Sequence, residues 1–321
     1  MTQEDILKSF TISKFLIKII AEDNLSLPAY KGSTFRGAFG IAFKKVCCIQ
    51  RQVTFDTCIL KEKCAYSFIF ESSPQKNAEN LSNLDEIPRP FVIEPPLTTK
   101  KEFFPGDELE FSFILFGKAI EYLPYMIYAF SQLGKIGIGK NRGKFKLKQI
   151  TDENGAIVYD GATETINKTD TTTLLDFIRF AGINTLHLSF ITPTRIKYEG
   201  HYIDKPEFHI IMRTLLRRIS SLMYFYCGKQ LELDYKNLIS LSRNSIIKKS
   251  NLNWVDWERY SSRQDIRMKL GGFVGDVVYE GDFKPFLPLL TLGEYTHIGK
   301  NCTFGLGKYK IKTGKGKNVS E

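Results

Sequence analysis

Two short segments of the chain combine residue types that suit the binding of phosphate groups. The first is GIGKNRGKFKLKQI, residues 137–150, and the second is HIGKNCTFGLGKYKIK, residues 297–312. Each contains Ile-Gly-Lys-Asn, a basic turn that contains glycine, and a stretch in which lysines alternate with aromatic or aliphatic residues. Glycine lets backbone N–H groups approach a phosphate closely, and lysine adds a positive charge. The two segments therefore predict contacts with a phosphate-bearing ligand.

The lysines that follow each turn occur at every second residue, which is the period of a β-strand. They are Lys144, Lys146 and Lys148 in the first copy and Lys308, Lys310 and Lys312 in the second. A half-exposed strand that faces a polyanion has this pattern, and so does an edge strand protected against aggregation. Because the chain has no GxxxxGK[ST] motif, the two copies favour RNA over a nucleotide as the ligand.

The composition is compatible with a polyanionic partner. The 321 residues include 45 Lys and Arg against 35 Asp and Glu, which gives a formal net charge of +10. Such an excess is typical of proteins that bind nucleic acid, an anionic membrane surface or a polyanionic substrate. No apolar run approaches the ~18–20 residues of a spanning helix, and MTQEDILKSF has no apolar signal-peptide core. We expect a cytoplasmic protein with no membrane partner, whose six cysteines lie in a reducing compartment.

The surrounding sequence predicts the same order of elements in both halves. In the first half, the order strand, helix, strand, helix, strand occurs at residues 11–20, 32–48, 107–117, 119–134 and 144–150. In the second half it occurs at residues 184–197, 206–226, 267–281, 283–299 and 302–312. This order is typical of the ferredoxin-like, split-βαβ pattern. We therefore predict an α+β fold of two tandem ferredoxin-like (RRM-like) domains; the alternative is one α+β domain with two accidentally similar loops.

The predicted domain boundaries follow the changes in composition. The first domain covers residues 1–150 and contains an insertion at about 47–105 that is rich in Cys, Pro, Ser and Asn. An excursion of this length is too long for a plain loop, so we expect it to have structure of its own or to cover a site. The polar residues 151–173 are expected to form a linker, and residues 174–321 the second domain.

Several stretches resemble the CRISPR-associated RAMP superfamily, in particular the branch that processes precursor CRISPR RNA. They are YKGSTFRGAFGIAFKKVCC, CILKEKCAYSFIFE, FITPTRIK, YSSRQDIRMKLGGFVGD and GEYTHIGKNCTFGLGKYKI. The last is similar to the C-terminal glycine-rich signature of that family. The resemblance implies binding of CRISPR repeat RNA and one metal-independent cut, without a cofactor, that leaves a 2′,3′-cyclic phosphate and a 5′-hydroxyl. The alternative is a non-catalytic RNA-binding RAMP subunit, whose partners are the other subunits of a CRISPR effector complex.

The residue types of the chain suit this chemistry. RNA supplies its own nucleophile, the 2′-OH, so the protein has to provide in-line geometry, cationic stabilisation of the phosphorane and a general acid or base. The sequence contains neither HExxH nor a DxD-like cluster of carboxylates. A two-metal nuclease is therefore poorly supported.

The catalytic candidates lie near the first helix and at the second loop. Relatives often place a catalytic histidine around the first helix, but this helix contains none. Tyr30 remains there as a proton donor, with Lys31 and Arg36 to position the scissile phosphate. His297 is the histidine candidate because it opens the second loop, where its imidazole would titrate near neutrality. The alternative is that His297 hydrogen-bonds a loop carbonyl, whereas His187 is expected to lie inside its strand.

The residues expected to contact RNA are mostly loop positions. They are Lys140, Arg142, Arg263, Gly299, Lys300, Gly305, Gly307 and Lys308. Arg263 is included because of the family resemblance. The helix at 206–226 adds Arg213, Arg217 and Arg218, whose spacing produces one basic stripe. This stripe is expected either to grip RNA or to form a solvated helix face.

The cysteines of the first half form a separate group. Cys47, Cys48, Cys58 and Cys64 are close in sequence. Relatives often have Cys-x2-Cys-x5-Cys, but Phe55 occupies the first of those three positions here. A tetrahedral thiolate zinc site needs four ligands. We therefore predict a small Cys-lined, Phe-packed subdomain without a metal; the alternative is a structural metal bound by Cys48, Cys58 and Cys64.

Overall fold

The computed structural model describes residues 9–49, 57–71, 87–168, 172–173, 184–256, 258–261 and 266–312. The chain divides into two compact units. The amino-terminal unit comprises Thr11–Thr172 with Phe225–Cys227, and the carboxyl-terminal unit comprises Met1–Phe10, Thr173–Tyr224 and Gly228–Glu321. Within the described ranges, no helix is both long and apolar enough to span a bilayer.

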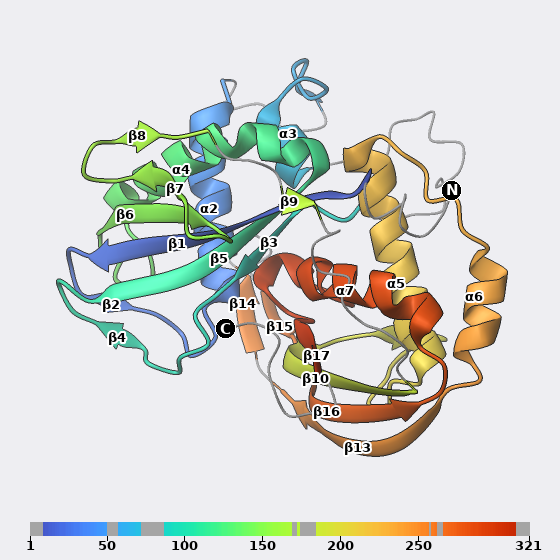
Figure 1. Cartoon of the computed structure of the whole chain (residues 1–321). Coiled ribbons are helices and arrows are strands. Elements are labelled where there is room, and N and C mark those ends of the chain that lie inside the picture. The colour runs from blue at the N-terminus through green and yellow to red at the C-terminus, as the bar shows by residue number, and fades with distance from the viewer. Residues whose placement is uncertain are drawn as a thin grey trace. The chain divides into compact units, whose positions relative to one another are not determined.

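The amino-terminal unit is built on one antiparallel sheet (Figure 1). Its strands are β1 (Thr11–Ala21), β3 (Phe91–Glu94), β5 (Glu108–Phe116), β6 (Phe145–Asp152), β7 (Ile157–Asp160) and β8 (Thr165–Ile166). They lie in the order β3-β5-β1-β6-β7-β8, and β9 (Thr172–Thr173) pairs with β1. The short strands β2 (Leu25–Ser26) and β4 (Glu102–Phe103) pair with each other. The helices are α2 (Gly32–Cys47), α3 (Ala65–Phe70) and α4 (Leu123–Ile136), with the 3-10 segment η2 (Gly117–Tyr122) before α4.

Aromatic side chains on α2 connect the helices to this sheet. Phe35, Phe39 and Phe43 recur every four residues, so they lie on one face of the helix, and all three are buried. The Phe39 ring stacks on Phe130 of α4, with ring centroids 4.5 Å apart. It also meets Phe113 of β5 edge to face at 5.3 Å. The helical spacing of these rings therefore fixes the core beneath the sheet.

The carboxyl-terminal unit contains a second antiparallel sheet (Figure 1). Its strands are β10 (Thr185–Thr194), β13 (Ile246–Val255), β16 (Gly272–Glu280) and β17 (Tyr309–Lys312), in the order β13-β16-β10-β17. Two further hairpins pair β11 (Lys197–Tyr198) with β12 (His201–Tyr202) and β14 (Glu258–Ser261) with β15 (Ile266–Lys269). The helical elements are α5 (Phe208–Leu222), the first two residues of η4 (Met223–Cys227), α6 (Tyr235–Ser242), η5 (Lys284–Phe286), α7 (Leu287–Thr296) and η6 (Cys302–Phe304). The η4 segment is a π-helical continuation of α5.

Both units have the same strand order. If the four shared strands of each unit are numbered along the chain, the order is 2-3-1-4 in both sheets. The main helix after the first shared strand is α2 or α5, each followed by a shorter helix (α3 or α6), and α4 or α7 follows the third. This is the ferredoxin-like arrangement. The prediction of an α+β fold with two such domains is confirmed.

Three parts of the fold differ from the sequence-based expectation. The range expected as a linker, 151–173, contains β7, β8 and β9, which extend the first sheet. The range expected as an insertion, 47–105, supplies β3, which is one of the four shared strands. The elements α6 and β13 were not predicted, and β13 forms the edge of the second sheet.

Candidate nucleic-acid interface

The first glycine loop connects α4 to β6 and is fixed by backbone hydrogen bonds. The Ile138 N–H donates to the Gly143 carbonyl at 2.9 Å, and the Lys140 N–H donates to the Ser26 carbonyl at 3.0 Å. The Asn141 side-chain oxygen accepts a hydrogen bond from the Ser26 N–H at 3.1 Å. The loop backbone is therefore anchored on β2, while the side chain of Lys140 remains exposed.

The second glycine loop connects α7 to β17 and repeats these contacts. The Ile298 N–H donates to the Gly307 carbonyl at 3.0 Å, and the Lys300 N–H donates to the Arg195 carbonyl at 2.9 Å. In addition, the Thr192 hydroxyl donates to the Gly305 carbonyl at 2.8 Å. Each loop thus presents an exposed lysine at the same position of the same hydrogen-bond pattern.

The glycine before each lysine is required by the backbone. Gly139 has φ 85° and Gly299 has φ 88°. A Cβ at Gly139 would lie 2.3 Å from the Ser26 carbonyl oxygen, and a Cβ at Gly299 would lie 2.4 Å from the Arg195 carbonyl oxygen. Both the positive φ and the close approach exclude a side chain. The likeness of the two sequence segments is therefore also a likeness of structure.

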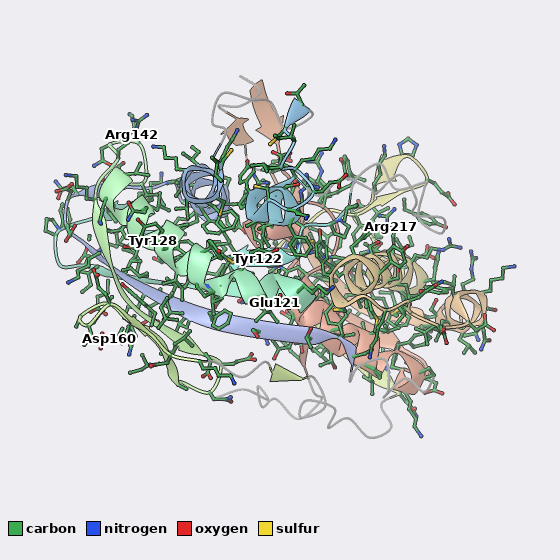
Figure 2. The ribbon with its side chains drawn as sticks, turned by 90° about the horizontal axis from the view of Figure 1, so that it is seen from above. Glu121, Tyr122, Tyr128, Arg142, Asp160 and Arg217 are labelled. Carbon is green, nitrogen blue, oxygen red and sulfur yellow. The ribbon has the colours of Figure 1, made fainter. Side chains whose placement is uncertain are left out.

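The predicted RNA contacts differ in their exposure. Lys140, Arg142 and Lys300 are exposed, and Lys308 is half-buried. Figure 2 labels Arg142 on the loop that follows α4. Gly305 and Gly307 are buried, and Gly299 is half-buried, so these glycines shape the second loop. Arg263 lies outside the described residues. Three cationic side chains thus remain accessible to a phosphate.

The two lysine rows are partly neutralised within their own sheets. In β6 the lysines are exposed and the residues between them are buried, which confirms the predicted alternation. However, Lys148 Nζ lies 2.6 Å from Glu108 Oε1 of β5. In the second sheet, Lys312 Nζ lies 2.9 Å from Asp276 Oδ1 of β16. The last lysine of each row therefore makes an ion pair within its sheet. The exposed loop cations Lys140, Arg142 and Lys300 are better candidates for a contact with phosphate.

The sequence did not reveal a polar cluster around Asp276. This carboxylate also contacts His187 Nε2 at 3.1 Å and accepts a hydrogen bond from Ser189. Burial raises the pKa of Asp276, but the hydrogen bonds from Lys312, Ser189 and His187 outweigh it and hold the pKa below its usual value. His187 was expected to lie inside its strand, yet its side chain is 32% exposed. The reason is that His187 shares its face of β10 with Ser189.

His297 lies inside the second loop. Its side chain is fully buried, and Nδ1 lies 3.0 Å from the Leu306 carbonyl oxygen. Its backbone has φ 58° and ψ 171°, a conformation that favours glycine, and Gly137 occupies the corresponding helix end in the first loop. This contact corresponds to the alternative given for His297, in which its ring hydrogen-bonds a carbonyl group of the loop. Burial removes the ring from the reach of a bound ligand, which argues against the catalytic role expected of it.

The candidates near α2 are also constrained. Lys31 is fully buried, and its ammonium group donates to two backbone carbonyls, one of them Thr98 at 2.7 Å. Burial lowers the pKa of Lys31. The Arg36 guanidinium lies over the Phe70 ring, 5.0 Å from its centroid. Burial argues against a phosphate contact for Lys31, whereas Arg36 is half-buried and stays a prediction. Tyr30 is half-buried and is the remaining candidate for proton donation there.

The cysteines of the first half lie in partly buried positions. Cys47, Cys48, Cys58 and Cys64 are all half-buried, and Phe55 lies outside the described residues. Burial, and then Cys64 and Cys48, raise the pKa of Cys47 to about 12. In the part of the chain that the structure describes, no three His, Cys, Asp or Glu side chains gather as a metal site requires. The alternative of a metal bound by Cys48, Cys58 and Cys64 therefore gains no support.

The three arginines of the basic stripe on α5 differ in their surroundings. Arg213 and Arg217 are exposed. Arg218 is half-buried, and its Nε donates to the Thr296 carbonyl at 2.6 Å. Arg218 thus supports the end of α7, directly before the second loop, and two of the three arginines remain on the surface.

Comparison with protein-family models gives a different match for each half. Residues 10–171 match the AF_1859_N family, described as an N-terminal domain. Residues 188–309 match the family of the CRISPR-associated endoribonuclease Cas6. An uncharacterised protein of Archaeoglobus fulgidus is 26% identical over 296 residues, which cover 89% of this chain and 93% of that protein. The Cas6 endoribonuclease of Streptococcus thermophilus is 28% identical over 127 residues, which cover 39% of this chain and 50% of that protein.

Solved structures share the fold at low sequence identity. A Cas6 product complex has a TM-score of 0.59 at 12% identity and covers 94% of this chain and 100% of that one. Thermus thermophilus Cas6 has a TM-score of 0.55 at 13% identity, with coverage of 94% and 99%. A partial Cas6-RT-Cas1–Cas2 complex has a TM-score of 0.56 at 15% identity and covers 97% of this chain but 47% of that one. The chain belongs to the AF_1859_N family, whose model matches residues 10–171, and its carboxyl-terminal residues 188–309 are similar to the CRISPR-associated endoribonuclease Cas6.

Proposed function

We propose that the chain binds CRISPR repeat RNA and cleaves precursor CRISPR RNA once, without a metal ion. The ribose 2′-OH attacks the adjacent phosphorus and loses its proton, while the bond from phosphorus to the 5′-oxygen breaks and that oxygen gains a proton. The products carry a 2′,3′-cyclic phosphate and a 5′-hydroxyl. The observation that carries this proposal is the pair of glycine loops, each with an exposed lysine on an anchored backbone.

The loop cations supply the electrostatic part of the proposed mechanism. Lys140, Arg142 and Lys300 are exposed, so their charges are available to hold the RNA backbone and to stabilise the phosphorane. Their loops are fixed by backbone hydrogen bonds, so little reorganisation is needed when the charge develops. Tyr30 is the candidate that donates a proton to the leaving 5′-oxygen, a role worth ~10²–10⁴-fold in rate.

A second function, RNA binding without cleavage, is favoured by one specific observation. Helix α2 contains no histidine, and His297 is buried against Leu306. A chain with these features could serve as an RNA-binding RAMP subunit of a larger CRISPR complex. The similar structures include a Cas6 product complex and a Cas6-RT-Cas1–Cas2 complex, so both RNA and other CRISPR proteins are proposed as partners.

The experiment that separates these functions uses labelled repeat RNA and purified protein in EDTA. The proposal expects a single cut that persists in EDTA and disappears when one 2′-deoxynucleotide replaces the scissile ribose. The 5′ fragment should end in a 2′,3′-cyclic phosphate. Tight binding without any cut would favour the non-catalytic function, and a cut that needs added Mg²⁺ would contradict the proposed chemistry.

A further inference from the structure

Helix α4 carries an exposed aromatic stripe that the core and the glycine loops do not explain. Tyr125 is 52% exposed and Tyr128 is 56% exposed. Gln132 and Lys135 follow on the same side of the helix, since the spacings of three, four and three residues bring side chains to one face. We name these four residues the α4 track. It is about 15 Å long at ~1.5 Å per residue.

The aromatic end of the α4 track is supported from behind. The half-buried ring of Tyr122 lies 5.4 Å from the ring of Phe68 and 6.3 Å from the ring of Tyr125, measured between centroids. Tyr122 therefore holds Tyr125 against the body of the unit. A ring that is already ordered loses little conformational freedom when a ligand stacks on it.

Positive charge lies at both ends of the α4 track. Lys135 is in the last turn of α4, and the first glycine loop follows with Lys140 and Arg142. At the other end, a groove of about 580 Å³ is lined by residues of η2, the start of α4 and β8, and its charged side chains are Lys118, Lys168 and Glu121, two cations against one carboxylate. Figure 2 shows Glu121 and Tyr122 at the end of η2 and Tyr128 further along α4, in the direction of Arg142.

We propose that the α4 track binds unpaired nucleotides of the RNA whose backbone the first glycine loop holds, with bases stacked on Tyr125 and Tyr128. This inference rests on the proposed function. Stacking requires free base faces, which unpaired nucleotides offer and duplex RNA does not. The α4 track offers two aromatic rings for bases, and the lysine and basic loop that follow offer positive charge for phosphates. This combination suits a nucleic-acid strand. The two rings make a smaller apolar area than a stable protein interface needs.

The test uses a labelled oligouridylate of about 12 nucleotides, within the range that single-strand binding domains occupy. Fluorescence anisotropy gives its Kd for the full chain and for Tyr125→Ala/Tyr128→Ala, with Tyr125→Phe/Tyr128→Phe to keep the rings. Ile157→Ala is the matched control, because Ile157 is an apolar side chain that is 44% exposed on β7 and is not one of the four residues of the α4 track. Thermal unfolding of each variant confirms that it is folded.

The proposal expects the alanine pair to weaken oligouridylate binding by at least about five-fold for each ring. The salt dependence should not change, because no charge is removed. The phenylalanine pair and Ile157→Ala should bind like the wild type. An unchanged Kd for the alanine pair, an equal loss in the phenylalanine pair, or no oligouridylate binding by the wild type would each overturn the proposal.

Three further outcomes distinguish failure of this proposal from failure of the proposed function. If the wild type cleaves repeat RNA while the alanine pair keeps its oligouridylate Kd, the α4 track is overturned and the proposed function stands. If the wild type neither binds nor cleaves repeat RNA, the proposed function itself is overturned. If the alanine pair instead abolishes self-association in sedimentation experiments with an unchanged Kd, the surface is an interface between proteins and the proposal fails.

Discussion

Replacing Gly139 with alanine tests whether the first loop must be held close to β2. A Cβ at this position would lie 2.3 Å from the Ser26 carbonyl oxygen, and the backbone has φ 85°. The loop has to move away from β2 to make room, which breaks the hydrogen bond from the Lys140 N–H to that oxygen. Gly155 is a matched control, because it has φ 84° but no atom lies within 4 Å of the position that a Cβ would occupy there.

The two variants should differ in stability only because the Cβ at residue 139 would lie too close to the Ser26 carbonyl oxygen. Gly155→Ala should cost ~1–2 kcal/mol, the strain of a left-handed conformation. Gly139→Ala carries the same strain, and in addition loses a hydrogen bond worth ~1 kcal/mol and suffers overpacking of ~1–3 kcal/mol that the moving loop partly relieves. The difference should be about 2 kcal/mol, which corresponds to a Tm lower by about 4–8 °C for a unit of this size.

The assay combines thermal unfolding with binding of repeat RNA. Gly139→Ala should unfold at a lower temperature than Gly155→Ala and should bind RNA more weakly, because its displaced loop no longer presents Lys140 correctly. Gly155→Ala should bind RNA like the wild type. Equal Tm values for the two variants, together with equal RNA affinities, would refute the claim that the contact with Ser26 positions the loop.

Three other changes test single residues. His297→Ala removes a buried ring and its hydrogen bond to Leu306, so it should lower Tm while the folded protein keeps its single-turnover cleavage rate; a slower cut at an unchanged Tm would restore a catalytic role. Tyr30→Phe should slow cleavage by about 100-fold or more without changing the Kd for RNA, and an unaltered rate would remove Tyr30 from the mechanism. Asp276 has a lowered pKa, so its stabilisation is present above the unfolded value near 3.8 and is lost as the pH falls through the folded pKa. Urea titrations should therefore show a flatter loss of stability in acid for Asp276→Asn than for the wild type or for exposed Asp204→Asn, and identical acid limbs would contradict the ion-pair assignment.

The parts of the fold that were predictable have a strong period. Strand β1 alternates buried and more exposed residues, and α2 repeats phenylalanine every four residues. In contrast, nearly every residue of β13 is exposed, so the sequence IIKKSNLNWV has no alternation that would reveal a strand. The polar range 151–173 was wrongly predicted as a linker because β7, β8 and β9 are strands of only two to four residues, too short to show a period; β7 and β8 lie at one margin of the sheet and β9 pairs with β1.

The parts of the candidate site that were predictable are those formed by one continuous segment of sequence. The two loops were found because glycine and lysine recur in the same order, and their backbone contacts share one pattern. The contact of His297 with a loop carbonyl was stated as an alternative from the sequence, because its partner Leu306 lies in the same loop. The burial of Lys31 was not predictable, because it depends on the carbonyl of Thr98, which is distant in sequence. The Asp276 cluster joins strands far apart in sequence. The α4 track had a usable signal, since Tyr125 and Tyr128 follow helical spacing with Gln132 and Lys135.

The most direct test of the central claim is the salt dependence of RNA binding after removal of the loop lysines. If each loop neutralises one phosphate of the same RNA, Lys140→Ala and Lys300→Ala should each reduce the slope of log Kobs against log salt by about 0.7, and the double variant by about 1.4. Lys148→Ala, whose lysine already pairs with Glu108, should change the slope less. A slope that stays at the wild-type value in either single variant would contradict the account.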